Sequence, residues 1–161
     1  KRLKTLPYEG LGHLLLPVLP LFRETAGRLL ANPRNMDFNG LQGVLRKAPS
    51  SLPVSLMLQF ATWHESGGAV LSDGRRLTEL LTNVQAPTML VIGSDDRLAS
   101  VADQESIFKM LPCIQKELLV LSTENGVAHD YGHVDPILGF RAESEVWPHL
   151  LRWVRAQDPK R

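Results

Sequence analysis

Two short runs of apolar residues stand out in the second half of the chain. The segments TMLVIG (88–93) and ELLVLS (117–122) are nearly continuous in apolar residues, which is typical of strands buried on both faces of a parallel sheet. Between them, SVADQESIFKML has apolar residues at helical spacing and opens with Ser100 and Asp103 in a capping-box pattern. Strand, helix and strand together predict a βαβ unit with a right-handed crossover.

Residues 1–85 have a different pattern, without a convincing strand. Apolar residues recur at helical spacing in LPLFRETAGRLLA and in LPVSLMLQFATWHES. We expect Asn35 or Asp37 to cap an intermediate helix through NGLQGVLRKA, Gly67 and Gly68 to end the next helix, and RRLTELL to form a short one. This half therefore predicts a small helical unit. Residues expected on one apolar face of its second segment are Leu52, Leu56, Gln59, Phe60 and Trp63.

The chain closes with AESEVWPHLLRWVRA, which predicts a last helix. Its apolar stripe consists of Val146, Trp147, Leu150, Leu151 and Val154. Pro148 is compatible with this helix only in its first turn, because a proline further inside would remove a backbone hydrogen bond and clash with the preceding turn.

The predicted sheet has too few strands to be stable by itself. Two doubly buried strands cannot cover each other's open edges. We therefore expect further strands, either from missing amino-terminal sequence or from a second copy of the chain. The chain begins with Lys1 and not with Met, and we interpret it as a piece of a longer protein.

Composition and charge narrow the class of protein. With 161 residues, 43% apolar and 22% charged, the chain resembles a globular protein of about one domain. The 18 basic residues are nearly balanced by 17 acidic ones, so no basic surface for binding nucleic acid is expected. Cys113 is the only cysteine, which excludes an internal disulfide and a multi-cysteine zinc site.

The most lipid-like stretch of the sequence is HLLLPVLPLF, at residues 13–22. It is interrupted by Pro17 and Pro20 and is shorter than the roughly 20 apolar residues of a membrane-spanning helix. No membrane span is therefore expected. The lone cysteine and the lack of a recognisable targeting segment favour a cytoplasmic location.

Polar residues gather where the two predicted strands end. GSDDRLAS places Asp95 and Asp96 after the first strand, and TENGVAHDYGH places His129 and His133 after the second. Because functional groups collect beyond the carboxyl ends of parallel strands, we expect these loops to approach each other. An aspartate could then orient a histidine and stabilise its imidazolium form.

Two other interpretations of the histidine segment stay open. His129 and His133 have the helical spacing of zinc ligands, and Asp130, Asp135 or Asp96 could complete a metal site. Gly132 and the loop-like ENG segment argue against a helix that would hold this spacing. The second interpretation is an ordinary polar turn in which the histidine caps the backbone.

The segments PTMLVIGSDDRLAS, LLVLS and YGHVDPILG…AESEVWPHLLRWV resemble the carboxyl-terminal part of an α/β-hydrolase, most closely of the lipase and polyester-synthase-like branch. The resemblance covers residues 86–156. It implies a partial α/β-hydrolase fold, in which residues 1–85 form a helical cap-like segment and residues 86–161 the βαβα end of the parallel sheet.

The resemblance also implies roles for individual residues. Asp96, three residues after Gly93, would be the acid of a catalytic triad, with Asp95 as the alternate. His133, in the YGH element, would be the base, with His129 as an alternate or a supporting residue. Asp135 would help to fix the turn into the last helices. No cofactor and no metal are implied.

The chain departs from the family pattern at the nucleophile. The family carries it in a G-x-S-x-G elbow, and the sequence contains no such motif. We therefore expect a carboxyl-terminal fragment of a serine or cysteine hydrolase acting on an ester or thioester, inactive alone, with the cap-like half covering an acyl substrate. The alternative is a non-catalytic interaction or dimerisation module derived from that fold.

Overall fold

The computed structural model describes part of the chain, namely residues 5–6, 26–36, 39–40, 43 and 52–158. Within these ranges the chain forms a mixed structure of helices and short strands. None of the described helices is both long and apolar enough to cross a membrane.

A parallel pair of strands lies at the centre of the carboxyl-terminal half. β3 (Thr88–Gly93) and β4 (Lys116–Leu121) pair in register from Thr88 opposite Lys116 to Gly93 opposite Leu121. α6 (Val101–Met110) connects them, which confirms the predicted βαβ order. β3 has the predicted bounds, and β4 begins and ends one residue earlier than expected.

The start of α6 follows the predicted capping box. The Ser100 hydroxyl oxygen accepts a hydrogen bond from the Asp103 backbone N–H at 3.1 Å, and the hydroxyl donates to the Asp103 carboxylate at 2.6 Å. This arrangement satisfies one of the backbone donors that a helix start leaves without a partner. It fixes where the loop after β3 ends.

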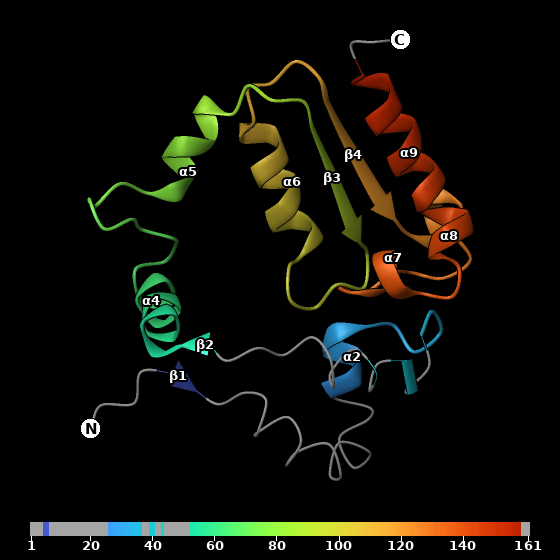
Figure 1. The fold of residues 1–161 in the computed structure, drawn as a ribbon, viewed down its shortest axis with the longest axis horizontal. Coiled ribbons are helices and arrows are strands. Elements are labelled where there is room, and N and C mark those ends of the chain that lie inside the picture. Colours follow the sequence, from blue (N-terminus) through green and yellow to red (C-terminus); the bar gives the residue numbers. More distant parts are fainter. Residues whose placement is uncertain (1–4, 7–25, 37–38, 41–42, 44–51, 159–161) are drawn as a thin grey trace.

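Short helices follow β4 and lead to the end of the described chain. They are η3 (Thr123–Asn125), α7 (Asp135–Leu138), α8 (Ala142–Glu145) and α9 (Trp147–Ala156). α6 and α9 flank the strands on opposite sides (Figure 1). The predicted single last helix is divided, because the backbone at Val146 leaves the regular helical path. Pro148 lies in the first turn of α9, as expected.

The described residues of the amino-terminal half form mainly helices. Residues 39–40 and 43 are helical, and the helices whose bounds are described are α2 (Ala26–Leu30), α4 (Val54–Glu65), α5 (Leu77–Leu80) and η2 (Leu81–Asn83). The expectation that this half has no strand is wrong, because β1 (Thr5–Leu6) and β2 (Leu52–Pro53) form a short antiparallel pair. Two-residue strands leave no readable alternation of apolar and polar residues, so the sequence pattern did not reveal them.

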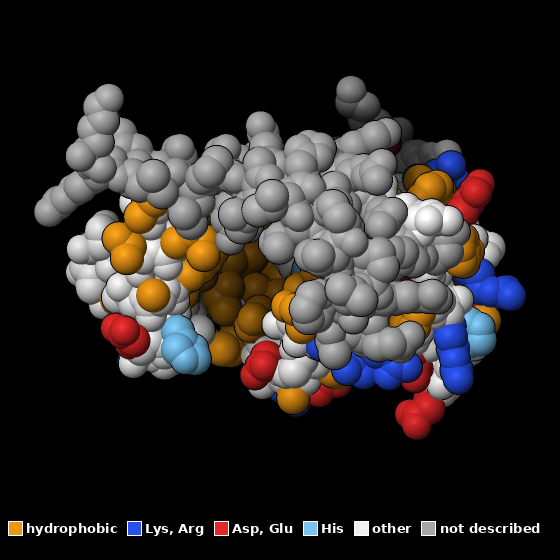
Figure 2. All heavy atoms as spheres, turned by 90° about the horizontal axis from the view of Figure 1, so that it is seen from below, with side chains coloured by type: hydrophobic (Ala, Val, Ile, Leu, Met, Phe, Trp, Pro, Cys, Tyr) orange, Lys and Arg blue, Asp and Glu red, His pale blue; other side chains and the backbone are white. Residues whose placement is uncertain are grey.

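α4 ends near the predicted glycines, but it has no buried face. The helix stops at Glu65, and Gly67 has a positive φ of 66°, a backbone conformation that favours glycine. No residue of α4 is buried in the described structure. From below, hydrophobic side chains lie over α4 and in a hollow between α4 and the rest of the molecule (Figure 2).

The fully buried side chains lie toward the carboxyl end of the sheet. One cluster contains Leu121, Tyr131, Ala142 and Val146, and a second contains Ala31 and Met36. The prediction of strands buried on both faces holds only at their ends, where Ile92 and Leu121 are buried. The earlier strand residues stay half-exposed, because the described sheet is only two strands wide.

Candidate functional site

Gly93 ends β3 where the backbone of a second loop runs directly against it. A Cβ atom at this position would lie 2.3 Å from the Tyr131 carbonyl oxygen and 2.4 Å from that of Gly132. Only glycine permits this approach, because backbone atoms cannot move aside as a flexible side chain can. The loop after β3 is therefore packed onto the segment that carries His133.

Hydrogen bonds join the same two loops. The Asp95 N–H donates to the Tyr131 carbonyl at 2.8 Å. The Leu121 carbonyl, at the end of β4, accepts from the Tyr131 N–H at 3.2 Å, from the Ser94 N–H at 3.3 Å and from the Ser94 hydroxyl at 2.9 Å. These bonds hold the ends of β3 and β4 and the histidine segment in one arrangement.

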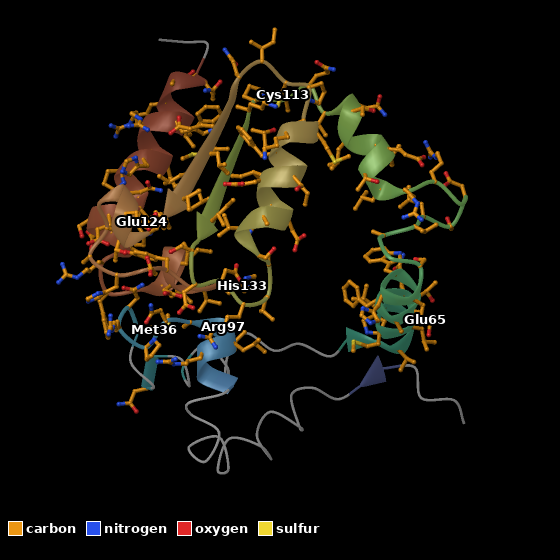
Figure 3. All side chains as sticks on the ribbon, turned by 180° about the vertical axis from the view of Figure 1, so that it is seen from behind. Met36, Glu65, Arg97, Cys113, Glu124 and His133 are labelled. Atoms are coloured by element: carbon orange, nitrogen blue, oxygen red, sulfur yellow. The ribbon has the colours of Figure 1, made fainter. Side chains whose placement is uncertain are left out.

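Asp96 and His133 meet across this junction. Asp96 Oδ2 lies 2.9 Å from His133 Nδ1. The other carboxylate oxygen accepts from the backbone N–H groups of Leu98 and Ala99 at 2.9 and 3.0 Å. The Asp96 side chain is only 6% exposed, whereas that of His133 is 43% exposed. The carboxylate is thus fixed and shielded, and the imidazole is accessible at the carboxyl end of the strands (Figure 3).

The surroundings of Asp96 keep it ionised. Burial raises the pKa of Asp96, but the hydrogen bonds from His133 and from the backbone N–H groups of Ala99 and Leu98 lower this pKa more, so it lies below the usual value. An ionised carboxylate only accepts hydrogen bonds, so the proton of this contact belongs on His133 Nδ1. Nε2 of His133 then carries the lone pair, and it makes no hydrogen bond within the described residues.

The two alternates predicted for the site lie outside this pair. The Asp95 carboxylate is 3.5 Å from Arg97 Nε and does not contact a histidine. His129 is half-buried, and the described part of the chain gives its ring no hydrogen-bond partner. Of the four predicted site residues, the structure therefore brings Asp96 and His133 into contact.

The histidine segment does not form a metal site in the described part of the chain. No group of three or more His, Cys, Asp or Glu side chains is placed to hold a metal ion there. Asp130, one of the three aspartates that the metal interpretation offered as a further ligand, accepts from the Thr123 N–H at 2.8 Å. This bond lowers the pKa of Asp130, although burial opposes it. The carboxylate thus serves to close the loop after β4.

Asp135 lies at the centre of a buried polar network. Its Oδ2 accepts from the Gly132 N–H at 2.8 Å, from the Asn35 side-chain amide at 3.0 Å and from the Asn32 N–H at 3.3 Å. Asp135 is fully buried, and three donors on one oxygen compensate for part of the loss of hydration. The resemblance implied that Asp135 helps to fix the turn into the last helices; the residue begins α7, and its carboxylate bonds to Gly132 and to the amino-terminal half.

Asn32 and Asn35 join the amino-terminal half to the histidine segment. Both side-chain amides donate to the Asp130 carbonyl, at 2.7 and 2.8 Å. Asn35 was expected to cap a helix, with Asp37 as the alternative. Asp37 lies outside the described residues, and the Asn35 amide instead bonds to Asp130 and Asp135. An asparagine before a helical segment is a common cap, so local sequence gave no sign of its distant partners.

Tyr131 and Glu145 form a second contact missed by the sequence analysis. The buried Tyr131 hydroxyl donates to Glu145 Oε2 at 2.9 Å, and Oε1 accepts from the Ala128 N–H at 3.3 Å. Burial, followed by the bond to Glu145, raises the pKa of Tyr131 well above its usual value. The phenol thus stays protonated and ties the histidine segment to α8.

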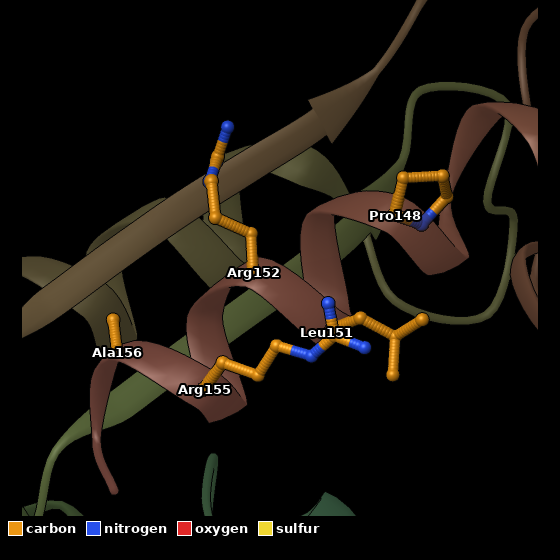
Figure 4. Close-up of a pocket in the computed structure, with 5 residues that line it drawn as sticks. All are labelled: Pro148, Leu151, Arg152, Arg155 and Ala156. Atoms are coloured by element: carbon orange, nitrogen blue, oxygen red, sulfur yellow. The ribbon is translucent and has the colours of Figure 1, made fainter. Parts of the chain in front are cut away.

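The described residues supply no nucleophile to this pair. No serine, threonine or cysteine among them forms a hydrogen bond with His133. A surface hollow on α9 contains neither member of the pair (Figure 4). Its lining residues share one side of the helix and are Pro148, Leu151, Arg152, Arg155 and Ala156.

Part of the chain is similar to a known lipase. Triacylglycerol lipase 1 of Arabidopsis thaliana is 35% identical to the chain over 80 residues, which are 48% of this chain and 18% of the lipase. No protein-family model matches the chain, and no solved structure does. The similarity supports a relation to a lipase-type hydrolase for about half of the chain.

Proposed function

We propose that Asp96 and His133 are the acid and base of a catalytic triad that hydrolyses an ester or thioester, or transfers an acyl group. In this proposal residues 86–161 are the carboxyl-terminal part of an α/β-hydrolase core, and residues 1–85 are its helical cap. The observation that carries the proposal is the 2.9 Å contact between a shielded carboxylate and an exposed imidazole. The partial similarity to a lipase supports the same class of reaction.

The orientation of His133 suits it to proton transfer. Asp96 holds the Nδ1 proton, so Nε2 can accept the proton of a serine hydroxyl or cysteine thiol as that group attacks the carbonyl carbon. The imidazolium, stabilised by Asp96, then donates this proton to the departing alcohol or thiol. Water then attacks the acyl-enzyme and gives a proton to His133, and the imidazolium passes this proton to the departing serine or cysteine, which releases the acid and restores the neutral imidazole.

The nucleophile in this proposal comes from sequence outside the 161 residues. The chain contains no G-x-S-x-G elbow, and the matched region covers only 18% of the related lipase. The donors that would stabilise the oxyanion come from the same missing part, since the residue after the nucleophile normally supplies one of them.

The experiment that tests the proposal is an ester-hydrolysis assay on the full-length protein. We expect His133→Ala to abolish measurable turnover, because in this proposal His133 is the group that takes the nucleophile's proton. Asp96→Asn is expected to lower kcat by about 10⁴-fold, the effect of the corresponding change in serine proteases, because the imidazole then adopts the wrong tautomer. Circular dichroism would verify that both variants are folded.

His64→Ala provides the matched control. His64 is exposed on α4, so its loss should leave turnover unchanged. Full hydrolysis by a folded His133→Ala variant would refute the proposed roles.

A docking role is the second candidate function. Within the described residues the β3–β4 sheet has only these two strands, so its outer edges are unpaired there, and α9 exposes Leu151 and Val154 at 53% and 64%. Open edges and exposed apolar side chains are typical of surfaces that meet another chain or another part of the same chain. The concentration dependence of the molecular mass distinguishes self-association from a purely catalytic role.

A further inference from the structure

Asn35 is a polar residue in one of the best-packed places of the molecule. It is 1% exposed, and its side-chain amide donates to both the Asp130 carbonyl and Asp135 Oδ2. The Asn35 backbone carbonyl accepts a hydrogen bond from the Phe140 N–H at 2.8 Å. One asparagine from the amino-terminal half thus contacts the chain before, within and after the turn that follows His133.

Contacts with residues 30–35 bracket His133 on both sides. On the preceding side, the Asp130 carbonyl is held by Asn32 and Asn35. On the following side, the Val134 N–H donates to the Leu30 carbonyl at 2.9 Å. A Cβ atom at Gly132 would lie 2.8 Å from the Asn32 backbone nitrogen, so the two segments are in close contact directly before His133.

The His133 ring has little else to hold it. Its side chain is 43% exposed and its hydrogen bond within the described residues is the one to Asp96. The direction of the ring therefore depends on where the backbone of residues 130–135 lies. A displacement of that backbone by about 1 Å is enough to break a hydrogen bond and can cost about 100-fold in rate.

Stability alone does not account for the network. Asn35 Oδ1 and Asp135 Oδ1 are both buried and have no hydrogen-bond partner among the described residues, and such atoms carry a desolvation penalty that an apolar contact would avoid. A functional site is one of the places where natural proteins break such packing rules.

We propose that Asn35, assisted by Asn32, is a positioning residue for His133. The two asparagines lock residues 130–135 so that Nδ1 of the ring meets Asp96 and Nε2 faces the reaction. The inference rests on the proposed function for its catalytic meaning, but the orientation of the ring can be measured without turnover.

The test is the tautomer of His133, measured by long-range ¹H–¹⁵N correlation spectra of the ring at a pH where it is neutral. The His133→Gln variant identifies its signals among the five histidines. We expect the Nδ1–H tautomer in the native protein. We expect Asn35→Ala to shift the ring toward the Nε2–H tautomer, and to lower kcat of the full-length protein by up to about 100-fold with little change in KM.

Two controls separate positioning from general loosening. Asn83→Ala removes an exposed asparagine at the other end of β3 and should change nothing. Val146→Ala opens a gap at a fully buried position and should lower Tm while the tautomer stays Nδ1–H. If Asn35→Ala does not fold, Asn32→Ala replaces it, since it removes the amide bond to Asp130 and keeps the backbone contact to Asp135.

Each result decides between the two claims. Loss of the Nδ1–H tautomer in the asparagine variants, but not in Val146→Ala, supports the positioning role. An unchanged tautomer in folded asparagine variants, or its equal loss in Val146→Ala, overturns that role and leaves the Asp96–His133 pair standing. An Nε2–H tautomer in the native protein removes the pair itself, and with it both the proposed function and the positioning role.

Discussion

Asp96 and His133 differ in burial in a way that suits their proposed roles. The carboxylate is shielded and fully engaged, with hydrogen bonds from one imidazole and two backbone N–H groups. Three donors stabilise its charged form and leave it no freedom to turn away. Within the described residues the imidazole keeps one nitrogen without a hydrogen bond and a surface open to reactants, which a proton-transfer group needs.

The lowered pKa of Asp96 predicts a specific loss of stability in acid. A carboxyl with a lower pKa in the folded than in the unfolded protein binds fewer protons when folded, so its contribution is complete above the unfolded pKa of about 3.9. This contribution is lost as the pH falls through the folded pKa. We expect Asp96→Asn to lower Tm at pH 7 and to flatten the decline of Tm below about pH 5.

Thermal unfolding followed between neutral and acid pH checks this prediction. Asp95→Asn is the matched control, because the neighbouring carboxylate makes only a long contact with Arg97. An Asp96→Asn variant whose acid decline parallels that of the native protein would contradict the assignment of that carboxyl as ionised and hydrogen-bonded.

At the scale of elements, the site depends on how the ends of β3 and β4 are joined. The loop after β3 can reach the histidine segment only because Gly93 has no side chain. Ser100 then ends that loop by capping α6. The segments after β3 and β4 thus each carry one member of the pair, and the close approach at Gly93 brings these segments together.

Gly93→Ala should therefore damage both the fold and the pair. Its Cβ would lie within 2.4 Å of two backbone oxygens, and such overpacking costs about 1–3 kcal/mol or more. We expect a lower free energy of unfolding in urea and, because the loops are forced apart, loss of the Nδ1–H tautomer of His133.

Gly43→Ala gives the comparison for this prediction. Gly43 is helical and has open space where a Cβ would be built, so the change should be neutral or stabilise by about 0.5–1 kcal/mol. Equal stability of the two variants would argue against the close approach at Gly93.

At the scale of the whole molecule, the packing is uneven. The fully buried residues gather around the ends of the strands, whereas α4 and the outer side of α9 are left exposed. The apolar stripe of α9 is divided accordingly, since Val146 and Leu150 pack inward and Leu151 and Val154 face outward. Figures 2 and 4 show hollows beside these surfaces.

The exposed side of α9 predicts self-association of the 161-residue chain. A contact between two copies would remove two apolar side chains from water and could pair an open sheet edge. Both effects favour association. We expect the mass measured by sedimentation to rise with concentration, and the double change Leu151→Glu with Val154→Glu to suppress this rise.

A substitution on α4 serves as the control for association. Leu58 is 63% exposed, so Leu58→Glu introduces the same charge on a different surface and should leave association unchanged. A monomer at every concentration would contradict the prediction and weaken the docking role.

The sequence alone predicted the features that depend on local pattern. Continuous apolar runs indicated β3 and β4, helical spacing and a cap indicated α6, and the polar loops beyond the strands placed Asp96 and His133 at one edge of the sheet. These predictions held because side-chain periodicity and capping act over a few residues. The position of Pro148 in the first turn of α9 was likewise predicted, because a proline is tolerated there and not further inside a helix.

Only the tertiary structure decided which residues meet. The resemblance had already favoured Asp96 over Asp95 and His133 over His129, and the structure shows that these two side chains are in contact while Asp95 lies beside Arg97. The tertiary structure also placed Asn32 and Asn35 beside Asp135, about a hundred residues further along the chain. Such contacts leave no local pattern, because a buried amide and a helix cap look alike in sequence and differ only in what the fold brings next to them.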